Sequence, residues 1–125
     1  MLKKSEDDSL YGAMGDQLKG YQRNYLRSLA HALKPVLLVG QKGVTEMVVL
    51  SLEEALGHHE LIKVKFIENK AKADKLSMLE AMQKATGAYF VGMVGHIATL
   101  YRPHPNKKDR KIRLPQKDVG VKTTS

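Results

Sequence analysis

The stretch that most constrains the fold of this 125-residue chain reads Val36-Leu37-Leu38-Val39-Gly40-Gln41-Lys42-Gly43-Val44-Thr45. Its first four residues form a continuous apolar run, which is typical of a short buried strand. The segment Gly40–Gly43 interrupts that run. Thr45 or a neighbour is then placed to cap a helix whose apolar positions continue to Leu56. We therefore expect a strand, a glycine-bounded loop and a helix, in that order.

Hydrophobic periodicity extends this alternation in both directions. Upstream, apolar residues recur at three- and four-residue steps from Leu18 to Leu33, which predicts an amphipathic helix that Pro35 ends. Downstream, Gly57 lies where a left-handed helix stop often occurs. Residues 61–67 then alternate apolar and basic side chains, so we expect a strand with one buried face and one face in water.

The rest of the patterned region predicts one more helix and a hairpin. A helical pattern covers about residues 71–86 and stops at Gly87. Two strands, 88–94 and 97–102, are separated by Gly95-His96, a spacing typical of a tight hairpin. The order helix, strand, helix, strand, helix, strand, strand indicates an α/β fold, with a mixed sheet and helices packed on it.

Composition divides the chain into one domain and two ends. A length of 125 residues is typical of a single domain. Residues 1–17 are polar and show no helical period, which predicts a flexible leader. Residues 18–103 hold nearly all the hydrophobic patterning. Residues 104–125 are basic and poor in apolar side chains, so we expect a disordered tail that either adds non-specific affinity for RNA or has no function.

The overall charge favours a polyanionic partner. The formal net charge is +8 and the pI is about 9.7, values typical of nucleic-acid binding, with an anionic membrane or an acidic protein as alternatives. Cysteine is absent, which excludes disulfides and fits the cytosol. The sequence has neither a signal-peptide pattern nor an apolar run of about 18 residues. We therefore expect a soluble, cytoplasmic protein.

The loop Gly40-Gln41-Lys42-Gly43 has the chemistry of a phosphate-binding turn. Two glycines let the backbone approach a bulky ligand, and the helix that follows directs N–H groups and its positive dipole end toward the loop. Lys42 adds a full charge. These features suit a sugar-phosphate backbone, as in the GXXG loops of KH domains. The alternative is an ordinary turn between a strand and a helix.

A second basic feature lies on the first predicted helix. Lys19, Arg23, Arg27 and His31 are spaced four residues apart, and Lys34 extends the stripe beyond the last turn. Such a stripe can follow the phosphates of a nucleic acid, and its affinity would depend steeply on salt. The alternative is a helix face in water, but the stripe has no acidic partners four residues away, which favours binding.

Signatures of enzymatic activity are missing from the sequence. Neither the GxxxxGK pattern of phosphate loops nor the GxGxxG pattern of dinucleotide folds occurs. A metal-dependent hydrolase using His58, His59 or His96 stays open as an alternative, although HExxH spacing is absent. No serine has a base at useful spacing, and no carboxylate pair is positioned for acid–base chemistry. We expect no catalytic residues, no cofactor and no small-molecule substrate.

Several blocks of the sequence, in a fixed order, carry a resemblance. They are Gln22-Arg23-Asn24-Tyr25-Leu26-Arg27-Ser28-Leu29-Ala30-His31, Leu33-Lys34-Pro35-Val36, Val39-Gly40-Gln41-Lys42-Gly43-Val44-Thr45-Glu46, His59-Glu60-Leu61-Ile62-Lys63-Val64-Lys65, Val94-Gly95-His96-Ile97 and Leu100-Tyr101-Arg102-Pro103. Together these blocks, which span about residues 18–103, resemble the YhbY family, the stand-alone bacterial form of the CRM (chloroplast RNA splicing and ribosome maturation) domain.

The resemblance implies a four-stranded mixed sheet with three helices, similar to the C-terminal domain of a bacterial translation initiation factor. It implies RNA binding through the GxxG loop and, for bacterial members, association with precursors of the large ribosomal subunit. Gly40 and Gly43 match the family's loop glycines, and Lys42 matches a position that is often basic. Gln41 departs from the pattern, because that position is often basic too, which puts one phosphate contact in doubt.

The sequence therefore predicts a monomeric, non-enzymatic assembly factor that binds ribosomal RNA. We expect no membrane as a partner. Its expected contacts are the four loop residues, Gly40 to Gly43, together with Lys19, Arg23, Arg27 and Lys34. The alternative from a different class is an adaptor on the ribosome whose basic face meets an acidic protein.

Overall fold

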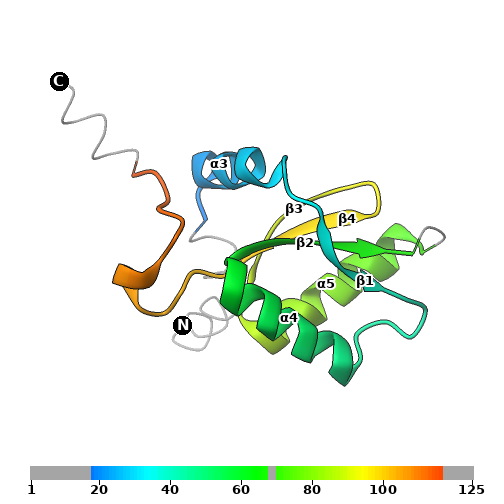
Figure 1. Cartoon of the computed structure of the whole chain (residues 1–125). Helices are drawn as coiled ribbons and strands as arrows, with labels where there is room; N and C mark the ends of the chain where they lie inside the picture. Colours follow the sequence, from blue (N-terminus) through cyan, green and yellow to red (C-terminus); the bar gives the residue numbers. More distant parts are fainter. Residues whose placement is uncertain (1–17, 68–69, 117–125) are drawn as a thin grey trace, which may run out of the picture.

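The computed structural model describes residues 18–67 and 70–116 (Figure 1). The expected leader and the last part of the tail, residues 117–125, lie outside the described residues. Within the described ranges the predicted order of helices and strands is confirmed. The elements are α3 (Gly20–Ala30), β1 (Pro35–Val39), α4 (Glu46–His59), β2 (Leu61–Phe66), α5 (Lys72–Thr86), β3 (Tyr89–Val94), β4 (Ile97–Tyr101) and a 3-10 turn, η2 (Lys107–Asp109).

The four strands form one mixed sheet in the order β1-β2-β4-β3. β1 and β2 are parallel, and α4 connects them, since parallel strands cannot be joined by a tight turn. β4 pairs antiparallel with β2 on one side and with β3 on the other. β3 and β4 form the predicted hairpin, whose turn contains Gly95 with a φ of 61°.

The helices cover the two faces of the sheet unequally. α4 and α5 pack on one face, and α3 lies against the other (Figure 1). The main core lies between the sheet and the α4–α5 pair, with Leu52, Phe66 and Leu79 fully buried. A second cluster joins Leu26 of α3 to Tyr101 of β4. Because α3 is a single short helix, part of its face of the sheet stays open to solvent.

The apolar run of β1 does not form the buried strand that the sequence predicts. Val36 and Leu38 are 49% and 60% exposed, whereas Val39 is fully buried. β1 is one of the two edge strands and pairs only with β2, and its two side-chain faces are not both covered. A continuous apolar run does not distinguish a central strand from an edge strand that borders an open surface.

The end of α4 also differs from the expectation. The helix continues through Gly57 to His59, and the residue with a positive φ is Glu60, with a φ of 65° and a ψ of −43°. A non-glycine residue in this region carries a conformational cost, which other contacts have to offset. At the end of α5 the prediction is confirmed, because Gly87 adopts a φ of 77°.

Glu60 supplies the contacts that hold residues 104–116, a segment that the sequence predicts to be disordered. Glu60 is 3% exposed, and its carboxylate accepts the backbone N–H groups of His104, Lys111 and Ile112 at 3.2, 3.1 and 3.0 Å. Ile112 and Leu114 add apolar contacts to the cluster under α3. The described part of the tail is therefore packed against the domain.

Candidate nucleic-acid interface

The loop between β1 and α4 is a closed turn. The backbone N–H of Gly43 donates to the carbonyl of Gly40 at 3.1 Å, which brings the two glycines to the ends of one turn. Gln41 and Lys42 occupy its tip, and both side chains are exposed. No described acidic side chain forms an ion pair with Lys42. The loop therefore presents one uncompensated positive charge to solvent.

The two glycines of the loop have different reasons to be glycine. Gly43 has a φ of 76°, and a Cβ atom there would lie 3.1 Å from Cε of Met78 on α5. A side chain at Gly43 is therefore opposed by both backbone conformation and packing. Gly40 has no such constraint, because a Cβ at that position would meet nothing within 4 Å. The absence of a side chain at Gly40 leaves open space on the surface of the loop.

The N-terminus of α4 is capped and carries an acidic residue. Oγ1 of Thr45 accepts the N–H of Val48 at 3.2 Å, which confirms Thr45 as the predicted cap. Glu46 occupies the first turn, where its negative carboxylate interacts favourably with the positive end of the helix dipole. That same negative charge would oppose an approaching phosphate, so the positive end of α4 is weaker as an anion site than the sequence motif alone indicates.

The basic stripe of the first helix is divided by the fold. Lys19 is the N-cap of α3 and Arg23 lies in its first turn, whereas Arg27 lies in its last turn. Lys34 lies beyond the helix, before β1, and borders an apolar hollow with Leu33. The stripe therefore starts at the N-terminal end of α3. It finishes at the start of β1, whereas the loop follows the other end of that strand.

Arg27 is the member of the stripe that reaches the open part of the sheet. Its guanidinium group lies over Gly92 of β3, where an added Cβ would be 3.0 Å from Nε of Arg27. Arg27 and His31 line a hollow with Lys63 of β2 and Thr99 of β4. Glycine at position 92 leaves room for the guanidinium group to approach the sheet this closely.

Lys63 and Lys65 are basic residues of this face that the sequence-based list of contacts omits. Val64 and Phe66 point into the core under α4 and α5, so Lys63 and Lys65 point to the face that α3 only partly covers. Lys65 lies opposite Leu38 on β1, near the end of that strand where the loop begins. The alternation of apolar and basic residues in 61–67 is the signal that could have included them.

Together these residues form a surface that we call the open sheet face, defined by Arg27, Lys63 and Lys65. It runs from the last turn of α3 across β2 toward the loop at the end of β1. No described carboxylate forms an ion pair with any of the three. A polyanion on this face would meet separate cations without displacing existing partners, and its binding would be salt-dependent.

The described residues offer no support for the metal-dependent alternative. No group of three or more His, Cys, Asp or Glu residues within 18–67 and 70–116 could hold a metal ion. The rings of His58 and His59 lie 6.2 Å apart at the end of α4. Nδ1 of His96 instead lies 3.2 Å from Nζ of Lys75, which is buried under the hairpin turn. None of the described helices is long and apolar enough to cross a bilayer.

Comparison with known families identifies the domain. Residues 18–102 match the model of the CRS1 / YhbY (CRM) domain, which covers all three helices and all four strands described above. The chain belongs to the CRS1 / YhbY (CRM) domain family. The resemblance drawn from the sequence blocks is thereby confirmed, together with the predicted four-stranded mixed sheet and three helices.

Individual relatives of this chain align over most of their own length. A protein of Haemophilus influenzae named "RNA-binding protein" is 43% identical over 96 residues, which are 77% of this chain and 93% of that protein. The Bacillus subtilis "Probable RNA-binding protein YqeI" is 37% identical over 98 residues, or 78% of this chain and 99% of YqeI.

A solved structure has the same fold. The solution structure of SAV1595 from Staphylococcus aureus, described as a candidate RNA-binding protein, superposes with a TM-score of 0.67 at 34% sequence identity. The superposition covers 78% of this chain and 99% of SAV1595. The CRM match ends at residue 102, so the packed segment 104–116 lies beyond it.

Proposed function

We propose that this CRM protein binds RNA without modifying it, and that its target is ribosomal RNA in precursors of the large subunit. The observation that carries the proposal is the CRM match over residues 18–102, together with relatives that are themselves named RNA-binding proteins. The net charge of +8 agrees with a polyanionic partner. The protein would act in the cytoplasm as a monomer, with no cofactor and no small-molecule substrate.

In this proposal, the loop and the open sheet face hold the RNA backbone from two sides. Lys42 at the tip of the loop and the backbone near Gly40 approach one phosphate. Arg27, Lys63 and Lys65 hold neighbouring phosphates across the sheet. Lys19 and Arg23 at the start of α3 and Lys34 before β1 lie outside this face and extend the positive field. Contacts of this kind position a protein on RNA and do not read its sequence.

The proposal is tested by equilibrium binding of the full chain to a fragment of large-subunit ribosomal RNA at several salt concentrations. We expect affinity to fall steeply between about 50 and 200 mM salt, because each phosphate contact releases counterions. Lys42→Ala should weaken binding to all RNA sequences equally and lower the salt slope by about one. Unchanged affinity in Lys42→Ala would remove the loop from the interface, and no binding by the native chain would remove the function.

A second candidate function is a protein-binding adaptor on the ribosome. Met47 and Leu50, on the exposed side of α4 next to the loop, are 70% and 63% exposed. Exposed apolar side chains of this size favour contact with another protein over contact with phosphates. Competition separates the two functions, because free RNA should displace the chain from ribosomal particles if the RNA is held directly and should leave an adaptor in place.

A further inference from the structure

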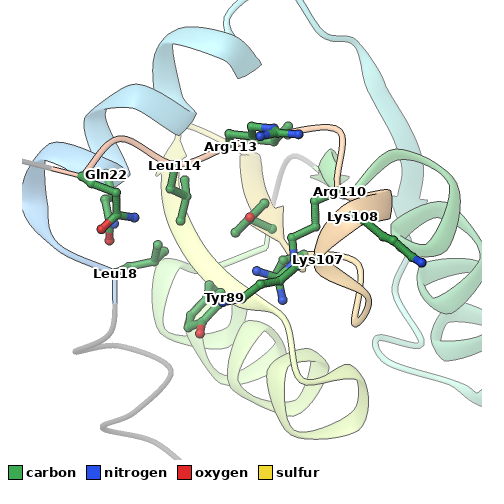
Figure 2. Close-up of a pocket in the computed structure, with 12 residues that line it drawn as sticks. Leu18, Gln22, Tyr89, Lys107, Lys108, Arg110, Arg113 and Leu114 are labelled. Carbon is green, nitrogen blue, oxygen red and sulfur yellow. The ribbon is translucent and has the colours of Figure 1, made fainter. Parts of the chain in front are cut away.

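A second cationic hollow lies at the opposite end of the sheet from the GxxG loop. It has a volume of about 690 Å³ and lies between α3, the start of β3 and the segment 103–116 (Figure 2). Tyr89 lies across from Tyr101 and Leu61 in the sheet register, whereas the loop follows the strand end at Val39 and Phe66. The length of β2 separates these two ends by roughly 17 Å.

The hollow combines positive charge with an aromatic surface. Figure 2 shows Tyr89 and Lys107 on one side of it and Arg113 and Leu114 on the other. Lys108 and Arg110 also line it, and none of its described lining residues is acidic. The ring of Tyr89 stacks on that of Tyr101, with centroids 6.1 Å apart and planes inclined by 19°. Both tyrosines line the hollow, but Tyr101 is buried, so Tyr89 offers the more accessible, half-buried ring.

The segment that carries these cations is held in a defined conformation. The carboxylate of Glu60 binds three of its backbone N–H groups, as described above. Nε of Arg110 donates to the carbonyl of His104 at 2.6 Å, and Nε2 of Gln22 donates to the carbonyl of Pro115 at 3.2 Å. A ligand would therefore meet cations on an ordered backbone, which lowers the entropy lost on binding.

Lys107, Lys108 and Arg113 differ from Arg110 because their side chains have no partner among the residues that the structure describes. No described carboxylate pairs with any of the three, and none of their side chains forms a hydrogen bond within the described residues. Sites that bind single-stranded nucleic acid typically combine cations that are not paired within the protein with an exposed aromatic ring. There, a base stacks on the ring and the backbone follows the cations.

We infer that this hollow is a second RNA contact, which takes an unpaired nucleotide of a single-stranded segment. The base stacks against Tyr89, and the flanking phosphates bind Lys107 and Arg113, with Lys108 at the rim. The inference rests on the proposed function, and it extends the interface onto residues beyond the CRM match. A chain bound at both places would hold a structured RNA on the open sheet face and a neighbouring single strand in the hollow.

The test compares binding of a fluorescent single-stranded RNA and of a blunt duplex of the same sequence, measured by anisotropy with the full chain. Tyr89→Leu should lower affinity for the single strand about tenfold, as expected for losing one stacked base, and leave duplex affinity unchanged. Tyr89→Phe retains the ring and should retain the affinity. Thermal melting of each variant establishes that the fold is intact.

The charge contribution is tested with a matched pair of double variants. Lys107→Ala with Arg113→Ala should lower the salt slope for the single strand by about 1.4, because each contact to a single strand contributes about 0.7. Lys72→Ala with Lys84→Ala removes the same charge from α5, outside the hollow, and should leave the slope close to native.

The outcomes separate this inference from the proposed function. If the Lys42 variant weakens binding while the Tyr89→Leu variant and the Lys107–Arg113 double variant bind as the native chain does, the second site is overturned and RNA binding stands. If the hollow variants weaken single-strand binding and the Lys42 variant does not, the second site stands without the loop. A native chain that binds neither RNA overturns both.

Discussion

Oε1 of Glu60 accepts the backbone N–H of Ile112 at 3.0 Å and thereby joins the end of α4 to the segment that follows the CRM domain. The same carboxylate also binds the N–H groups of Lys111 and His104. A buried carboxylate is stable only when such donors replace water. Glu60 has a positive φ, and α4 ends at this residue.

Replacing this carboxylate should loosen the segment and destabilise the protein. Glu60→Gln keeps the shape but replaces one acceptor oxygen by an NH2 group, a donor that faces backbone N–H donors, so the free energy of unfolding should fall by about 2 kcal/mol. Urea denaturation measures the change, and amide exchange should accelerate at Lys111 and Ile112. Glu54→Gln, on the exposed side of α4, is the control and should stay within about 0.5 kcal/mol. Equal stability of the two variants would contradict the role assigned to Glu60.

The two loop glycines should respond differently to alanine. Gly43→Ala forces a side chain into a φ of 76° and toward Met78, so it should destabilise the fold by about 1 to 3 kcal/mol. Gly40→Ala enters open space with ordinary backbone angles and should leave thermal stability nearly native. RNA affinity is the second readout. A loss in Gly40→Ala at native stability would support close approach of the RNA backbone, and native affinity would favour an ordinary turn.

The open sheet face gives a prediction about Lys65, which the sequence-based list omits. Lys65→Ala should weaken RNA binding and lower the salt slope by about one, since a single phosphate contact is lost. Lys72→Ala removes the same charge from the exposed start of α5 and serves as the matched control. A Lys65 variant that binds with the native salt slope would restrict the interface to the loop and α3.

Alkaline pH should destabilise the protein partly through Tyr101. Burial, and to a lesser extent the charge of Glu60, raises the pKa of Tyr101 from 10.0 to about 12. The unfolded chain then loses this proton before the folded chain does, so stability falls as pH rises from about 10 to 12. The absorbance of tyrosinate at alkaline pH should show a late-titrating component that Tyr101→Phe lacks. Titration of all tyrosines near pH 10 would contradict this burial.

Much of the fold follows from patterns that individual residues make visible. The alternation of Ile62, Val64 and Phe66 predicts β2 because each of them enters the core, and Gly87 marks the end of α5 because only its left-handed conformation fits there. The order of elements then follows from counting such segments. These signals are local, so a single sequence reveals them.

The missed features depend on contacts between distant residues. The exposure of Leu38 results from the place of β1 at the sheet edge, which no local pattern encodes. The order of the segment around Ile112 depends on a carboxylate 52 residues away. The spacing of Arg27 and Lys34 predicts one stripe, yet the helix ends at Ala30 and the two residues border different hollows. Pairing across the fold, rather than composition, determines these outcomes.

The most direct test of the central claim is the sedimentation of this protein in cell lysate, followed across ribosomal fractions at low and moderate salt. The account predicts co-migration with precursors of the large subunit at low salt and release as salt rises, because phosphate contacts hold the protein. Lys42→Ala and Lys65→Ala should be released at lower salt than the native chain. A native protein that stays at the top of the gradient even at low salt would contradict a role on the large subunit.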